Sequence, residues 1–141
     1  MYILAYLKQS TPLPSEIPSY IYVYNGGVSS LNGTYKLVDN IKSLDDIVKE
    51  STEVLTVYTQ ENGTGKITFT RDIDFNSVYL ITGIEGGAEG TNFAYKSEII
   101  QKNKADKWPH ECEWSLATLM HPDFTPPDTY LPVPTVSLNE P

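Results

Sequence analysis

The sequence is poor in the features that mark exported or membrane-bound proteins. Its one cysteine, Cys112, cannot form a disulfide within the chain, which fits a reducing compartment. No apolar run approaches the roughly 18–20 residues needed to cross a bilayer. Residues 1–8 lack the basic segment that precedes the apolar core of a signal peptide. We therefore expect a protein made in the cytoplasm without a signal peptide and with no membrane partner.

Basic side chains are also scarce. The chain has 10 lysines and arginines against 18 aspartates and glutamates, which gives a formal net charge of −8. Such a charge repels a polyanion. The sole arginine, Arg71, argues against a surface built on bidentate phosphate or guanine contacts. We do not expect nucleic acid as a partner. The lysine cluster that remains is expected to be a solvated face: Lys96, Lys102, Lys104 and Lys107.

Strand signals dominate what is present. Ten tyrosines, together with threonine, valine and isoleucine, favour pleated and half-buried surfaces. Residues 20–24 alternate tyrosine with isoleucine and valine, the period of a strand with two different faces, and Asn25-Gly-Gly27 predicts a turn. Residues 54–59 and 66–70 predict a hairpin, and residues 77–82, apolar on both faces, predict a central strand. Further strands are expected over residues 2–7, 34–38 and 93–96.

Outside the strands, the sequence predicts one short helix and one extended arm. Ser43 and Asp46 occupy the positions of a capping box, which predicts about two helical turns ending near Glu50. Six prolines from residue 122 onward exclude a regular helix there. We therefore predict a mainly β protein. Residues 1–121 are expected to form a small antiparallel β-sandwich or barrel with one short helix, and residues 122–141 an extended proline-rich C-terminal arm.

Two groups of side chains are candidates for interaction. The tyrosines of residues 20–24 project from one side of their strand, where sugar rings could stack, although tyrosine equally suits a core or a protein interface. The arm carries more aliphatic and aromatic residues than a disordered tail does. We expect it to be buried on its own domain or on a neighbouring subunit. The candidate residues are Tyr20, Tyr22, Tyr24, Tyr130, Leu131, Val133 and Val136.

The densest set of reactive groups surrounds Cys112. His110, Cys112 and His121 could ligate a metal ion, or a histidine could activate the thiol as a nucleophile. The spacing matches no common zinc motif, and the simplest interpretation is a strand in which Cys112 packs inward. We therefore assign no metal, no cofactor and no catalytic residue, and expect no enzymatic activity.

Two loops deserve comparison with known ligand-binding patterns. Asp72 and Asp74, with Asp39 and Asn40, could supply oxygen ligands for calcium, but the calcium-loop pattern is absent and a polar turn explains them more simply. Gly83–Gly90 follows a strand but lacks the lysine and hydroxyl residue of a phosphate-binding loop. A flexible connection is expected there.

Three short motifs follow one another along residues 20–136. They are Asn32-Gly-Thr-Tyr35, Tyr79-Leu-Ile81 at the end of a central strand, and Pro132-Val-Pro-Thr-Val136 near the exit. In this order they resemble the small β-modules of bacteriophage tail-fibre and other virion surface proteins, although the tryptophan of that pattern is absent from the central strand. The resemblance implies a β-fold and brings no catalytic residues.

These observations favour a structural role. We expect a virion-associated structural or accessory protein, a capsid, neck or tail component, that acts through contacts with other protein subunits, which could include further copies of the chain. The alternative is an acidic cytosolic binding protein that neutralises a basic partner such as a toxin or nuclease, because its charge of −8 would speed that encounter. A carbohydrate-binding module is the third interpretation.

Overall fold

The computed structural model describes residues 18–48, 54–84, 92–100 and 105–141. The strand expected over residues 2–7, most of Gly83–Gly90, and two lysines of the basic cluster, Lys102 and Lys104, lie outside these ranges. The described strands are β1 (Tyr20–Tyr24), β2 (Gly33–Leu37), β3 (Leu55–Gln60), β4 (Lys66–Arg71), β5 (Ser77–Thr82), β6 (Phe93–Ser97), β7 (Trp114–Leu116) and β8 (Thr135–Ser137).

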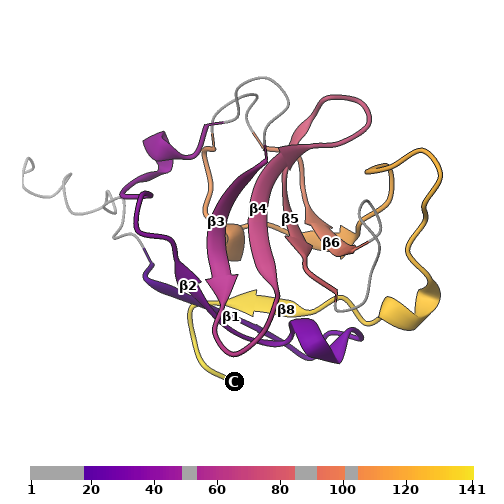
Figure 1. Cartoon of the computed structure of the whole chain (residues 1–141), viewed down its shortest axis with the longest axis horizontal. Coiled ribbons are helices and arrows are strands. Elements are labelled where there is room, and N and C mark those ends of the chain that lie inside the picture. Colours follow the sequence, from indigo (N-terminus) through magenta and orange to yellow (C-terminus); the bar gives the residue numbers. More distant parts are fainter. Residues whose placement is uncertain (1–17, 49–53, 85–91, 101–104) are drawn as a thin grey trace, which may run out of the picture.

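All eight strands belong to one antiparallel sheet in the order β7-β6-β5-β4-β3-β2-β1-β8. Strands β1 to β7 form a meander, and the last strand returns to pair with β1 (Figure 1). The sheet curls into a half-barrel, so that β8 also contacts the 3₁₀ turn Pro109–Glu111 that precedes β7. The prediction of a mainly β protein is confirmed. The sandwich alternative is not, because the described strands form a single sheet.

The alternating pattern of the sequence explains the two faces of the sheet. In β1, Ile21 and Val23 are buried, whereas the tyrosines beside and between them are exposed or half-buried. Asn25 ends this strand with a φ of 62°, a left-handed conformation that asparagine adopts more readily than most residues. Strand β5 is buried on both faces and has a neighbour on each side, as predicted for a central strand. Leu80 on its outer face packs in a small second cluster with Phe93 and others.

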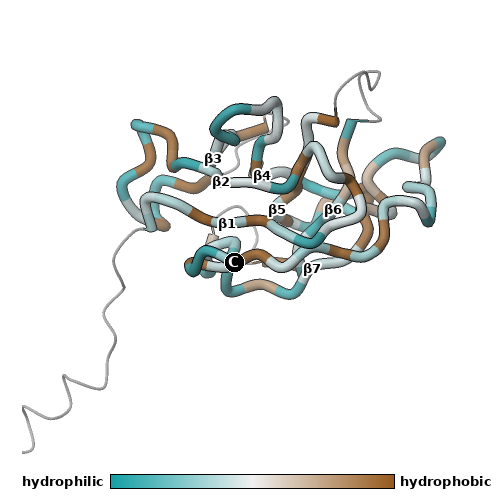
Figure 2. Tube along the Cα trace, turned by 90° about the horizontal axis from the view of Figure 1, so that it is seen from below, coloured by the Kyte–Doolittle hydropathy of each residue, from teal (hydrophilic) through white to brown (hydrophobic). Residues whose placement is uncertain are grey.

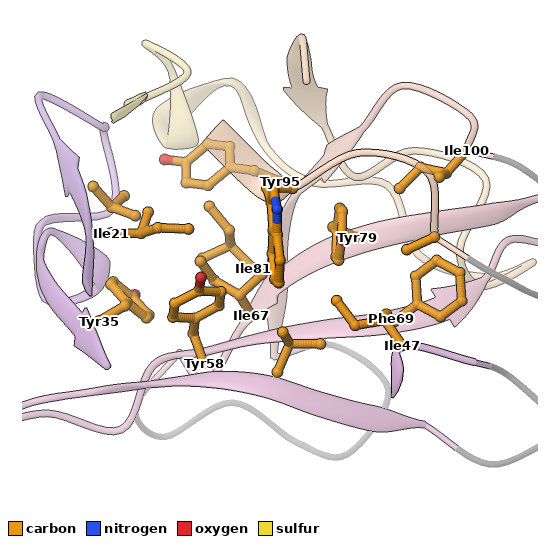
Figure 3. Close-up of a cluster of buried hydrophobic side chains, with 14 of the residues drawn as sticks. Ile21, Tyr35, Ile47, Tyr58, Ile67, Phe69, Tyr79, Ile81, Tyr95 and Ile100 are labelled. Carbon is orange, nitrogen blue, oxygen red and sulfur yellow. The ribbon is translucent and has the colours of Figure 1, made fainter. Parts of the chain in front are cut away.

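Four tyrosines lie in the main core, inside the curl of the sheet, and each ties a connecting segment to it (Figure 3). Each ring is buried, and each hydroxyl donates a hydrogen bond of 2.6–2.7 Å to a backbone carbonyl. The pairs are Tyr35 with Leu31, Tyr58 with Pro18, Tyr79 with Lys107, and Tyr95 with Tyr130. A buried tyrosine needs such a partner, so the core positions these irregular segments as well as the strands.

The predicted two-turn helix is wrong within the described residues. One 3₁₀ turn, Leu44–Asp46, stands in its place. The capping residues behave as expected, since the Asp46 carboxylate accepts hydrogen bonds from the backbone N–H groups of Lys42 and Ser43. The Ile47 side chain is fully buried in the core. The capping signal therefore marks a turn that places Ile47, and residues 43–48 form no helix beyond this 3₁₀ turn.

The proline-rich C-terminal segment adds an edge strand to the sheet. Val136 of β8 pairs with Val23 of β1, and the segment runs alongside β1 at the lower side of Figure 1. Figure 2 marks the C-terminus close to the β1 label. Tyr130, Val133 and Val136 are half-buried against the main core. Leu131 is 47% exposed, so the chain itself does not bury it, and its burial by a neighbouring subunit stays a prediction. The extended proline-rich arm, separate from the β domain of residues 1–121, is therefore not confirmed.

Candidate functional site

The tyrosine face of β1, defined by Tyr20, Tyr22 and Tyr24, lies on the outer side of the sheet. Tyr20 is 40% exposed and the other two are half-buried. Tyr20 is opposite Lys36 of β2, while Tyr22 and Tyr24 are opposite Ser137 and Thr135 of β8. The predicted projection of these tyrosines from one side of a strand is confirmed, and the return of β8 surrounds them with polar side chains.

The structure does not assemble the predicted reactive cluster into a metal site. No group of three or more metal-ligating side chains occurs among the described residues. The thiol of Cys112 packs against the core and donates to the Trp108 carbonyl at 3.5 Å, and burial raises its pKa to about 12. Burial also lowers the pKa of His110, whereas His121 is exposed. A protonated thiol is a poor nucleophile at neutral pH.

The carboxylate of Asp72 holds the turn between β4 and β5. One of its oxygens accepts the N–H groups of Asp74 and Asn76, both at 2.9 Å. The Asp72 carbonyl accepts the N–H of Phe75 at 3.0 Å. These bonds explain how Asp72, a residue only 8% exposed, is tolerated there, and they match the polar-turn interpretation of the sequence.

The two described lysines of the basic cluster are engaged with the protein itself. The ammonium group of Lys96 donates to the Thr118 carbonyl at 2.8 Å, and Lys107 forms an ion pair with Glu98 at 2.9 Å. Both ammonium groups therefore have a partner within the described part of the chain.

Sequence reasoning missed an exposed apolar loop pair formed by Ile73, Phe75 and Leu119. Phe75 is 71% exposed and Leu119 54% exposed, and both have positive φ, 66° and 61°. The N–H of Ile73 donates to the Leu119 carbonyl at 2.8 Å, which joins the β4–β5 turn to the loop after β7. Left-handed backbone costs an ordinary residue about 1–2 kcal/mol. The loop pair therefore presents large apolar side chains on strained backbone.

A polar groove lies on the outer side of β3, β4 and β5. Its volume is about 730 Å³, within the range of small-ligand sites. We call it the threonine groove, because five of its side chains are threonines. It is lined by Val54, Thr56, Thr59, Gln60, Gly63, Thr64, Gly65, Lys66, Thr68, Thr82, Gly83, Ile84 and Asn92. Its described lining contains no carboxylate, in a chain whose net charge is −8.

Comparison with known proteins gives no assignment: the chain matches no family model, and no curated protein or solved structure is significantly similar to it. In the described part of the chain, no helix is long and apolar enough to cross a membrane.

Proposed function

We propose that this protein is a structural docking module that binds other protein subunits, and that the apolar loop pair is its main contact. The observation that carries the proposal is the combination, at Phe75 and Leu119, of strong exposure with positive φ. Bulky residues in this conformation are uncommon and gather at functional sites. In the isolated chain, these exposed apolar side chains stabilise neither the fold nor its hydration.

The energy balance changes when a partner covers the loop pair. Fully burying a phenylalanine or leucine side chain is worth about 1.5–3 kcal/mol, which exceeds the backbone cost at each position. Exposed apolar residues clustered on a surface are characteristic of protein interaction sites. The two loops are also held rigidly by the Asp72 turn and by the bond from Ile73 to Leu119, so little conformational entropy is lost on binding.

Charge indicates the kind of partner. Asp74 and Asp123 are exposed in the same two loops, and the whole chain carries −8. A partner with an apolar pocket rimmed by lysine or arginine would complement this arrangement. The tyrosine face of β1 provides a second, more polar contact surface, as tyrosine commonly does in interfaces.

The resemblance to virion modules supplies the proposed setting, a bacteriophage particle in which this protein is a capsid, neck or tail component. Mass spectrometry of purified particles tests that setting directly. Recovery of the protein at a fixed ratio to the major capsid protein is expected. Its absence from particles would remove the virion proposal and leave the acidic neutraliser of a basic partner as the better account.

Substitution of the loop pair tests the docking role. Phe75→Asn removes the ring and relieves the backbone, so the free protein should gain about 1 kcal/mol of unfolding free energy. Its recovery with particles should fall about tenfold, equivalent to 1.4 kcal/mol of binding. Leu138→Asn is the matched control, because Leu138 is 47% exposed and has no positive φ. Equal recovery of Phe75→Asn, Leu138→Asn and the unaltered protein would contradict the proposal.

A further inference from the structure

Thr68 is the one residue of the threonine groove whose buried hydroxyl lacks a partner. It lies on the outer face of β4, is 3% exposed, and no hydrogen bond reaches its Oγ1 within the described structure. Its register neighbours are Thr56 of β3 and Leu80 of β5. A buried hydroxyl without a partner costs about 1–3 kcal/mol, and such groups call for an explanation. A ligand hydroxyl seated in the groove would supply the partner.

Two other threonines of the groove already donate their hydroxyl protons to hydrogen bonds within the protein. The hydroxyl of Thr64 donates to the Gly83 carbonyl at 2.6 Å, and that of Thr82 donates to the Asn92 carbonyl at 3.0 Å. Each oxygen keeps lone pairs that can accept from a ligand. These two hydroxyls therefore face the groove as acceptors.

The balance of donors and acceptors selects the chemistry of the ligand. An inorganic anion needs donors on every side, whereas the hydroxyls of Thr64 and Thr82 present it with lone pairs. A sugar hydroxyl both donates and accepts, so it can pair with Thr68 and with the acceptors at once. We propose that the threonine groove binds a neutral saccharide.

The remaining wall fits the same ligand. Val54 and Ile84 offer apolar surface for the C–H groups of a sugar ring. Gln60 serves the fold, because its side chain donates to the carbonyls of Ser30 and Asn32 and accepts from the N–H of Gly65. Its rigid amide therefore fixes one end of the groove before any ligand arrives.

This site is separate from the proposed docking surface. The groove is built around Lys66 and Thr68 in the first half of β4, whereas the apolar loop pair begins after the end of that strand at Arg71. It also lacks the tyrosines of β1. Saccharide binding and subunit docking can consequently be tested by different variants.

Nuclear magnetic resonance titration of the full chain tests the proposal. The probes are glucose, galactose, mannose, N-acetylglucosamine and cellobiose, each at millimolar concentrations. Inorganic phosphate is titrated separately as the test for anion binding. At least one saccharide should shift the backbone amides of Thr56, Gly65 and Thr68 in a saturable manner. Phosphate should not. Saturable shifts with phosphate alone, or with none of the saccharides, would overturn the assignment.

The variant Thr68→Val separates binding from folding. It keeps the shape of the side chain and removes the unpartnered hydroxyl, so the midpoint of urea unfolding should rise while saccharide affinity falls about tenfold. Thr70→Val is the control, because Thr70 lies on the same face of β4, is 8% exposed and is not among the lining residues of the groove. Unchanged affinity in Thr68→Val, or an equal loss in Thr70→Val, would refute the role of the groove.

Discussion

The buried tyrosines predict how the protein should respond to alkaline pH. Burial is the largest cause that raises the pKa of Tyr35, Tyr58 and Tyr79 well above the ordinary value of 10.0, and it also raises the pKa of Tyr95. A group whose pKa is raised by folding stabilises the native state fully below its unfolded pKa and loses that contribution as pH rises toward the folded pKa. Stability should therefore be independent of these groups up to about pH 10 and fall above it.

The magnitude follows from counting the groups that stay neutral in the fold. Each such tyrosine lowers the unfolding free energy by about 1.4 kcal/mol per pH unit above 10. The three strongly shifted groups together lower it by about 4 kcal/mol per unit. A domain with about 5–10 kcal/mol of stability should then unfold roughly one to two and a half units above pH 10. Tyr58→Phe should reduce the slope by about 1.4 kcal/mol per unit.

Parallel measurement of tyrosinate absorbance and circular dichroism checks this prediction. The ionisation of the buried tyrosines should coincide with the loss of β-structure. If all ten tyrosines ionised in one reversible step while the dichroism of the folded protein persisted, the assignment of these hydroxyls to the core would be refuted.

Two further predictions concern the thiol and the C-terminal segment. Because burial raises the pKa of Cys112 to about 12, alkylation by iodoacetamide at pH 8 should be far slower in the folded protein than in urea; equal rates would refute the burial of this thiol. Deleting residues 122–141 removes β8 and the half-buried Tyr130, Val133 and Val136, and should lower the unfolding free energy by roughly 2–4 kcal/mol. Urea denaturation measures this change, and an unchanged midpoint would show that the segment is passive.

Local patterns in the sequence predicted the strands well. The alternation in Tyr20–Tyr24 reflects the side-chain period of two, whereas the continuous apolar run of Ser77–Thr82 reflects a strand buried on both faces. Both patterns are properties of adjacent residues. The helix prediction failed because capping residues favour a helical start without fixing its length. Ile47 follows the 3₁₀ turn with a non-helical backbone and is held in the core by tertiary packing, which capping residues do not specify.

Features that depend on distant residues could not be predicted in the same way. Val136 pairs with Val23, although most of the sequence lies between them, and no local signal specifies such a partner. Likewise, Thr56, Thr68 and Thr82 share the threonine groove through strand register. The left-handed backbone of Phe75 is imposed by the hydrogen bonds of its turn, against the preference of the residue itself.

The hydroxyl of Tyr95 joins three remote parts of the chain. It accepts the N–H of Val28 at 3.0 Å and donates to the Tyr130 carbonyl at 2.6 Å. During synthesis on the ribosome, this junction cannot form until residue 130 has left the exit tunnel, by which time every earlier strand has emerged. Until then the edge of β1 lacks its partner β8 and is open to pairing with other chains. Native closure of this fold therefore requires that residues 130–137 have emerged from the ribosome.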